Sequence, residues 1–208
     1  SLLLKRNRPN ETVTALMRID DLIQRMGGIT KQLKSFARKN TESFVPLNFN
    51  EAFLSAIAIM EPQLKQTNVK IETFIEPEPI IIMADQQRLE QVIINLLRNA
   101  LDAVMEVEDP EIKMSLYKDA SAIFSIKDNG KGINNLETIF EPFQTTKDLG
   151  KGLGLGLAIS SNIISELGGT LQGKNLSSNG AEFKITLPLF DPSKITIRET
   201  ENSKSGIE

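Results

Sequence analysis

The stretch that most constrains this chain is an amphipathic segment near its middle, from Asp85 to Met105. Asp85 is the predicted N-cap of a helix here, because its carboxylate can accept hydrogen bonds from the open amides of the first turn. We expect the rest of the chain to be organised around this helix. Its apolar residues recur at spacings of three and four, the pattern of one buried stripe: Leu89, Val92, Ile93, Leu96, Leu97, Ala100, Leu101 and Val104.

The same segment carries polar residues that packing alone does not require. Asn95 and Asn99 are four positions apart and therefore project from one face, with Arg98 and Asp102 close by. Asparagine is a poor helix former, so two of them on one flank need a reason. One reason is a solvated face. The other is a site where neutral oxygens ligate a hard cation and an arginine meets phosphate.

Composition limits the possible classes of protein. The 208 residues suffice for one domain with an appendage or for two small domains, and 40% hydrophobic with 25% charged residues is typical of a soluble globular protein. A net charge of −3, without a basic stretch, argues against a nucleic-acid partner. With 0 cysteines and 0 histidines, the sequence offers no disulfide, thiolate or imidazole metal site, histidine-based triad or phosphoacceptor histidine. Its apolar runs are too short to span a bilayer.

A narrower apolar pattern precedes this region, from about Glu11 to Arg38, and we call it the seam helix. It is typical of a coiled coil or a four-helix bundle. Each buried Leu or Ile contributes roughly 1.5–3 kcal/mol, so we expect the seam to pack against a partner. The alternative is a helix packed within its own domain. The seam positions are Ile19, Leu22, Met26, Ile29, Leu33 and Phe36.

The remaining patterns predict an α/β two-layer sandwich with a mostly antiparallel, mixed sheet. Asn50 is the predicted cap of a helix over residues 51–66, and Gly168-Gly169 is the predicted C-cap of a helix over 153–167. Residues 40–46 are expected to be a polar connection and domain boundary. The predicted strands are 69–75, 80–83, 111–118, 122–127, 170–176 and 181–187.

The first glycine motif, DNGKGI, spans Asp128 to Ile133. Asp128 ends a predicted strand, where its carboxylate could accept a hydrogen bond from an exocyclic amine such as adenine N6. Gly130 and Gly132 would let the backbone approach the ring closely. Alone the string is a weak signal, because Asp-Asn-Gly is also a good hairpin turn.

The second glycine motif, GKGLGLGLAI, spans Gly150 to Ile159 and runs directly into an apolar helix. Free amides and the positive end of a helix dipole would face outward together, which suits phosphate. A structural or linker role is the alternative. The string also satisfies GxGxxG, but no strand precedes it directly, so a Rossmann assignment fails, and it lacks the GK[ST] ending of a Walker loop.

A third stretch, EPFQTTK, lies just before that loop, from Glu141 to Lys147. Phe140 and Phe143 could anchor a mobile segment. Thr145, Thr146 and Lys147 offer hydrogen-bond donors to phosphate.

Together and in this order, the motifs resemble those of the GHKL, or Bergerat-fold, ATP-binding family. They look most like the catalytic domain of bacterial sensor histidine kinases. NLLRNALDA matches the N box of that family, DNGKGI its first glycine box, EPFQTTK its F box and GKGLGLGLAI its second glycine box. GGTLQGKN and NGAEFKITLP are similar to its closing hairpin. The resemblance covers residues 44–189 and, with the seam helix, is closest to kinases of the nitrogen and C4-dicarboxylate-transport type.

The resemblance implies a role for each matching residue. Asn99 would be the magnesium ligand, Arg98 would meet phosphate, Asp128 would hold the adenine amine, and Asp102 would support the base through water. Residues 143–152 would form the ATP lid, and Asn95, Asn99 and Lys147 would be the catalytic residues. The implied ATP-binding set is Asn95, Arg98, Asn99, Asp102, Asp128, Gly130, Gly132, Ile133, Phe140, Thr145, Thr146, Lys147, Gly152, Leu153, Gly154, Leu155 and Gly156.

The resemblance also implies a domain organisation. Residues 1–43 would be the second helix of a dimerisation and phosphotransfer hairpin, 44–190 the catalytic ATP-binding domain, and 191–208 a polar tail. Such a kinase transfers the γ-phosphate of Mg-ATP to a histidine on the first helix, for relay to an aspartate of a response regulator. This sequence has 0 histidines, so we expect a fragment without that helix, which binds Mg-ATP but cannot phosphorylate itself. We also expect homodimers through the seam helix and a membrane-anchored parent protein.

Three alternatives stay open. ATP-hydrolysing relatives such as gyrases and chaperones resemble one another in placing a glutamate where Asn95 stands, and asparagine cannot act as a general base. A degenerate, non-catalytic module that docks a response regulator is the second. An anti-sigma-factor-type serine kinase is the third, and the seam helix argues against it.

Overall fold

The computed structural model describes residues 13–17, 19, 20, 23, 27, 44–144 and 154–194. The described residues between 13 and 27 are helical, and Ile19 of the predicted seam is 42% exposed. The seam positions Leu22, Met26, Ile29, Leu33 and Phe36 lie outside the described residues. Among the helices that are described, none has both the length and the apolar character needed to cross a membrane.

The central helix is α3, Gln86–Val104, and it confirms the amphipathic pattern. Asp85 is its N-cap, and the carboxylate accepts a hydrogen bond from the Arg88 amide at 2.8 Å. All eight apolar residues of the predicted stripe are buried. The helix therefore forms because its capping residue and its apolar repeat predict the same segment. Its apolar stripe is buried, and its polar residues lie on the other flank.

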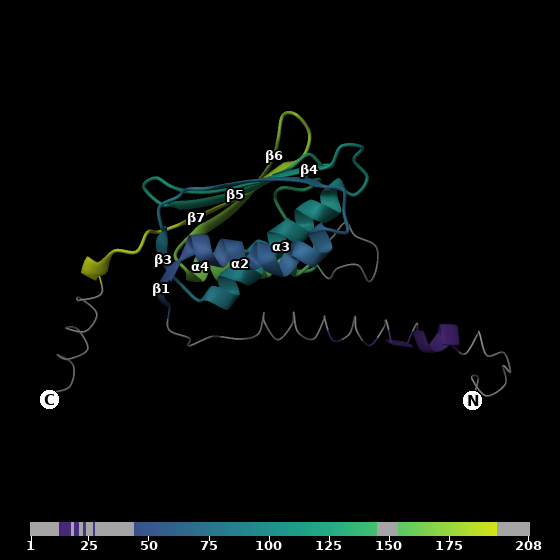
Figure 1. Ribbon diagram of the computed structural model, residues 1–208, viewed down its shortest axis with the longest axis horizontal. Helices are drawn as coiled ribbons and strands as arrows, with labels where there is room; N and C mark the ends of the chain where they lie inside the picture. The colour runs from purple at the N-terminus through teal and green to yellow at the C-terminus, as the bar shows by residue number, and fades with distance from the viewer. Residues whose placement is uncertain are drawn as a thin grey trace.

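A five-stranded mixed sheet lies against the helices (Figure 1). The edge pair β2–β4 is parallel, and the pairs β4–β5, β5–β7 and β6–β7 are antiparallel. The prediction of a mostly antiparallel mixed sheet is confirmed. In spatial order the strands are β2 (Lys70–Ile75), β4 (Glu111–Lys118), β5 (Ala122–Asp128), β7 (Ala181–Leu187) and β6 (Thr170–Asn175).

Three helices cover one face of this sheet: α2 (Phe49–Leu64), α3 and α4 (Gly156–Glu166) (Figure 1). The core lies between the two layers. At its centre the Phe124 ring of β5 meets Phe53 at 5.4 Å and Phe49 at 6.3 Å between ring centroids, and all three side chains are fully buried. Each such burial contributes roughly 1.5–3 kcal/mol. The α/β two-layer sandwich is confirmed.

The start of the domain differs from the prediction. Val45–Asn48 forms β1, which pairs antiparallel with β3 (Ile81–Ala84), although residues 40–46 were expected to be a polar connection. Helix α2 then begins at Phe49 with Asn48 as its N-cap, because the Asn48 side chain accepts from the Asn50 amide at 3.1 Å. The prediction that Asn50 caps this helix is therefore wrong.

Asn50 ties the helix to the segment before β3 instead. Its Nδ2 donates to the carbonyl oxygens of Glu76 (2.9 Å) and Glu78 (3.2 Å), and its Oδ1 accepts from the Ile80 amide (3.3 Å). Within the predicted polar tail, the structure describes a short 3-10 helix, Pro192–Lys194.

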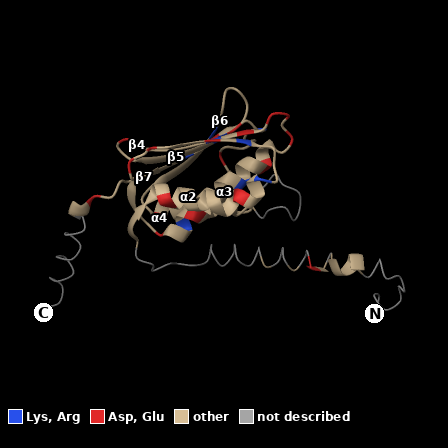
Figure 2. Ribbon diagram, in the orientation of Figure 1, with Lys and Arg blue, Asp and Glu red and all other residues tan. Residues whose placement is uncertain are grey.

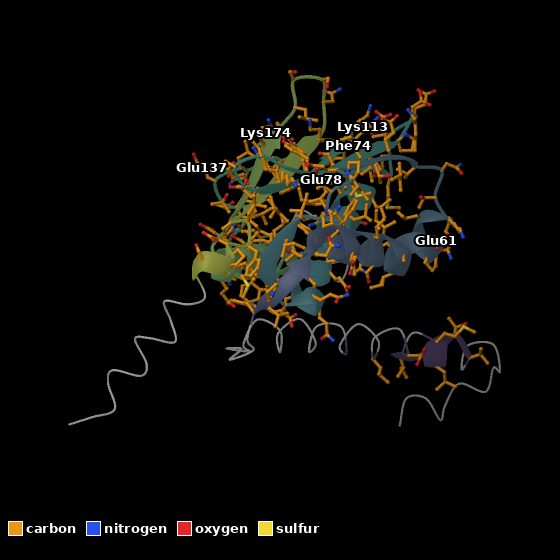
Figure 3. All side chains as sticks on the ribbon, turned by 60° about the vertical axis from the view of Figure 1, so that its left-hand side comes forward. Glu61, Phe74, Glu78, Lys113, Glu137 and Lys174 are labelled. Atoms are coloured by element: carbon orange, nitrogen blue, oxygen red, sulfur yellow. The ribbon has the colours of Figure 1, made fainter. Side chains whose placement is uncertain are left out.

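The outer face of the sheet carries charged side chains. On β2 and β4, Lys70 and Lys113 form ion pairs with Glu72 and Glu111 at 2.6–3.3 Å. Figure 3 labels Lys113 and Phe74 on these strands, and Phe74 is 59% exposed. Figure 2 shows that acidic and basic residues intermingle over the sheet and helices. Exposed pairs of this kind contribute little to stability, so the fold depends on the other face.

Candidate functional site

Helix α3 touches both glycine motifs, at two points on one flank. At Gly156, the first residue of α4, an added Cβ would lie 2.5 Å from Asn95 Oδ1. At Gly130 an added Cβ would overlap the carbonyl oxygen of Ala103. Asn99 is one turn from both Asn95 and Ala103, roughly 6 Å along the helix axis. The structure therefore brings Asn99 between the two motifs that sequence reasoning joined.

Asn95 has a definite partner in α4. Its Nδ2 donates to the Oγ of Ser160 at 2.9 Å, and Ser160 is only 1% exposed. Ser160 lies four residues after Gly156, so both face α3 from one side of α4. This bond fixes the first turns of α4, whose N-terminal amides point out of the helix. Sequence reasoning missed Ser160, because a serine on an apolar helix carries no local signal.

Asp128 is a buried carboxylate at the end of β5, and it is 5% exposed. Its Oδ1 accepts from the amides of Gly130 at 2.9 Å and Ala181 at 3.3 Å, whereas Oδ2 accepts no hydrogen bond from the described residues. Burial raises the pKa of Asp128, and the two amide hydrogen bonds offset only part of that rise. Asp128 therefore offers one oxygen to an external donor such as an amine.

The turn after Asp128 depends on close backbone approaches. Gly132 has φ +73°, and Gly180, the residue before β7, has φ +90°. An added Cβ at Gly180 would overlap the carbonyl oxygen of Asp128, so the two strand ends meet without room for a side chain. Ile133, half-buried, exchanges two hydrogen bonds with Asn175 of β6. The first glycine motif is thus a compact turn packed on the closing hairpin.

The predicted phosphate loop is described only at its ends. The Phe143 amide donates to the Gly154 carbonyl oxygen at 3.1 Å, so the residues that flank 145–153 meet. Leu155 is 1% exposed, which leaves its backbone and not its side chain for a ligand. Helix α4 begins at Gly156 and not at the predicted Leu153, and its predicted end at Gly168-Gly169 is confirmed. Thr145, Thr146, Lys147, Gly150, Gly152 and Leu153 lie outside the described residues.

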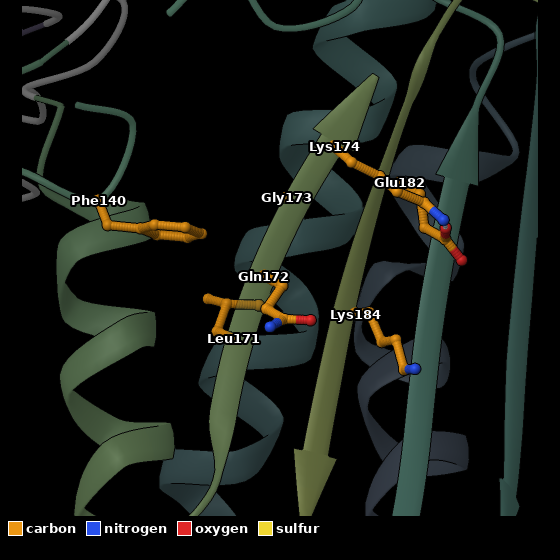
Figure 4. A pocket seen from close by; sticks show the side chains of 7 residues that line it. All are labelled: Phe140, Leu171, Gln172, Gly173, Lys174, Glu182 and Lys184. Atoms are coloured by element: carbon orange, nitrogen blue, oxygen red, sulfur yellow. Dashed lines mark ion pairs between the residues drawn. The ribbon is translucent and has the colours of Figure 1, made fainter. Parts of the chain in front are cut away.

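Phe140 lies beside β6, the edge strand of the sheet (Figure 4). It lines a hollow of about 400 Å³ at the edge of the sheet, with its ring directed toward β6 near Gly173 (Figure 4). Lys174 and Glu182 form an ion pair of 2.7 Å on the far side of that strand. The described structure thus places Phe140 at the sheet edge beside Gly173, where a Cβ would also lie 3.4 Å from Ile133 Cδ1.

Arg98 and Asp102 line a second hollow, of about 660 Å³, between the C-terminal ends of α2 and α3. Gln63, Asn68 and Glu108 also line it. Arg98 is exposed on the flank of α3 next to the one that carries Asn95 and Asn99. Among the described residues, Arg98 lines this hollow and not a glycine motif, and its contact with phosphate stays a prediction.

Comparison with known proteins identifies this arrangement. The family model described as histidine kinase-, DNA gyrase B-, and HSP90-like ATPase matches residues 84–191, just over half of the chain. The chain is 36% identical over 183 residues to the C4-dicarboxylate transport sensor protein DctB of Rhizobium meliloti (strain 1021). That match covers 85% of this chain and 29% of DctB, so the chain spans less than a third of this relative's length. This match agrees with the predicted similarity to sensor kinases of the C4-dicarboxylate-transport type.

Solved structures agree with the family match. The catalytic domain of histidine kinase ThkA, in a nucleotide-free form, superposes with a TM-score of 0.63 at 31% identity, covering 71% of this chain and 96% of that one. ThkA in complex with the response regulator protein TrrA superposes with a TM-score of 0.72 at 26% identity, covering 89% of this chain and 53% of that one.

Proposed function

The chain belongs to the histidine kinase-, DNA gyrase B- and HSP90-like ATPase family and is the ATP-binding catalytic domain of a two-component sensor histidine kinase. On that basis we propose which residues bind each part of the nucleotide. Asp128 accepts the adenine amine through Oδ2. Asn99 ligates a cation that the phosphates also bind. The backbone amides at the start of α4 bind phosphate oxygens. The observation that carries this proposal is the contact of α3 with both glycine motifs, at Ala103 and Asn95.

We infer that Mg²⁺ joins the nucleotide at Asn99. Mg²⁺ prefers oxygen ligands and usually takes few from the protein and several from phosphate and water. The half-buried Asn99 side chain carries such an oxygen, and the described residues contain no group of three or more acidic, histidine or cysteine side chains that could hold a metal alone. When bound, the ion would neutralise charge on the phosphates. Asn99 would then orient the nucleotide rather than supply a full metal cage.

The parent protein, we propose, transfers the γ-phosphate to a histidine outside this sequence, which has 0 histidines, and then to an aspartate of a response regulator. Phosphoryl transfer needs positioning and charge neutralisation above all, and Lys147 of the lid region would add positive charge. The absence of a carboxylate at position 95 supports transfer to a side chain over hydrolysis, because an amide cannot activate water. The ThkA–TrrA complex supports a response-regulator partner. Dimerisation through the seam helix and a membrane-anchored parent belong to the same proposal.

The test has two stages. First, calorimetric titration of this chain with ATP, with and without Mg²⁺, should show binding that Asn99→Ala weakens only when Mg²⁺ is present and that Asp128→Ala weakens in both cases. Second, a longer form that carries the histidine, given ATP labelled at the γ-phosphate, should gain acid-labile label on the protein. Released phosphate without protein label would contradict the kinase proposal and favour an ATPase. Nucleotide binding without either signal would favour a docking module.

A further inference from the structure

The side-chain amide of Asn175, the last residue of β6, binds the backbone of a single distant residue. The Ile133 amide donates to Asn175 Oδ1 at 2.7 Å, and Asn175 Nδ2 donates to the Ile133 carbonyl oxygen at 2.9 Å. The two residues are 42 positions apart, and Ile133 belongs to no strand. The side chain therefore replaces one rung of a β-ladder and closes the turn against the sheet edge.

This contact fixes the far end of the turn that begins at Asp128. Gly132, the residue before Ile133, has φ +73°, and a Cβ there would lie 2.9 Å from Asn175 Oδ1. The near end is fixed by the hydrogen bonds that Asp128 accepts from Gly130 and Ala181. Asn175 is thus the side chain that sets where the turn ends, and its donor and acceptor are both needed.

We propose that Asn175 is a positioning residue for recognition of the adenine base, acting through the backbone of Ile133. The inference rests on the proposed nucleotide site, in which Asp128 accepts the base amine. Asn175 does not touch the base; it holds the turn so that Asp128 and Ile133 keep their relative placement.

The two hydrogen bonds are better suited to positioning than to stability. Both are exposed, and an exposed hydrogen bond adds little net stability to the fold. Misplacing a binding group by about 1 Å can lower activity by about 100-fold. Loss of Asn175 should therefore affect base recognition more than it affects folding.

The test measures dissociation constants of the full chain for ATP and GTP, by competition against a fluorescent nucleotide, together with thermal melting. Asn175→Ala should raise the Kd for ATP about tenfold while the Kd for GTP changes less than about twofold, because the keto oxygen of guanine cannot donate to Asp128. Asn175→Asp should show the same loss, since a carboxylate cannot donate to the Ile133 carbonyl oxygen. Gln172→Ala is the matched control, an amide on the other face of the same strand.

Three outcomes would overturn the inference. If the unaltered chain binds ATP and Asn175→Ala leaves the Kd for ATP unchanged, this inference is overturned while the proposed function stands. Equal loss for both nucleotides, together with a lowered melting temperature, would assign Asn175 a purely structural role. An unaltered chain that does not bind ATP would overturn the proposed function and this inference with it.

Discussion

Asn95 on α3 donates a hydrogen bond from its side-chain amide to the hydroxyl of Ser160 on α4, at 2.9 Å. The family resemblance makes Asn95 a candidate catalytic residue, yet this bond also makes it a structural link between two helices. Its Oδ1 approaches Gly156 so closely that a Cβ there would lie 2.5 Å away. The placement of the amides that begin α4 therefore depends on the same side chain.

We expect the pair to be coupled energetically. In a double-mutant cycle of Asn95→Ala and Ser160→Ala, measured by urea unfolding, the coupling free energy should be about 0.5–1.5 kcal/mol, the net contribution of one hydrogen bond. Ser161→Ala, at the next position of α4, is the control and should show no coupling to Asn95. Additive effects of the Asn95 and Ser160 substitutions would contradict the structural link.

A second prediction concerns the stability effects of replacing Gly180 and Gly168, two glycines of the closing hairpin with positive φ. Gly180→Ala should lower the free energy of unfolding by more than about 3 kcal/mol, because the new methyl group would overlap the Asp128 carbonyl oxygen at φ +90°. Gly168→Ala, at φ +75°, meets only Pro188 Cγ at 3.8 Å and should lose about 1–2 kcal/mol from backbone strain alone. Equal losses in chemical denaturation would show that the close approach at Gly180 relaxes without consequence.

Local chemistry made most of the fold predictable. The Asp85 cap and the apolar stripe that follows it specify α3 because both signals lie within a few residues. The bounds of β4, Glu111–Lys118, match the prediction because side chains on its two faces alternate between core and solvent. The Gly168-Gly169 end of α4 followed from the special backbone that a helix C-cap requires.

Contacts between distant residues explain what sequence reasoning missed. Asn48 and Asn50 both suit a helix N-terminus, and only the partners of Asn50, 26 to 30 positions away, decide which one caps α2. Strand β1 exists because β3 lies beside it, not because of its own four residues. Ser160 and Asn175 likewise take their roles from partners 65 and 42 positions away.

The Asp128 carboxylate should lower the stability of the fold, although it is the proposed acceptor for the adenine amine. Since burial raises its pKa in the folded state, its carboxylate opposes folding at pH values above that raised pKa, and the effect disappears as the pH falls below the ordinary value. Asp128→Asn keeps an oxygen for the Gly130 and Ala181 amides. It should therefore melt at or above the temperature of the unaltered chain at pH 7, with the difference shrinking toward about pH 4.

The same substitution should weaken ATP binding. The N–H groups of the new amide would face the N–H groups of the adenine amine, so the two would repel. Losing one such base contact lowers affinity by about 1–3 kcal/mol, or about fivefold to 150-fold. Calorimetric titration measures the loss. A variant that binds ATP normally would contradict the role of Asp128, and a lower melting temperature at pH 7 would contradict the direction of its pKa.

Glu182 should show the opposite pH dependence. It is 7% exposed on β7, and burial alone would raise its pKa, but hydrogen bonds from Lys174 and Ser125 and the charge of Lys127 hold that pKa below its usual value. A lowered folded-state pKa stabilises the fold at pH values above the ordinary one, and this contribution is lost as the pH falls through the folded value. Glu182→Gln should cost about 1 kcal/mol at pH 7, a discounted figure because the side chains of Lys174 and Lys127 are 67% and 48% exposed.

Urea unfolding of the Glu182→Gln variant and the unaltered chain, from pH 7 to pH 3, measures this effect. The difference in unfolding free energy should be largest at pH 7 and should vanish at the acid end, where Glu182 is protonated in both states. Glu72→Gln is the matched control, since Glu72 is also paired with two lysines but lies exposed on β2, and its effect should be smaller at every pH. A difference that grows on acidification would mean that burial, and not the lysines and Ser125, governs the Glu182 carboxyl group.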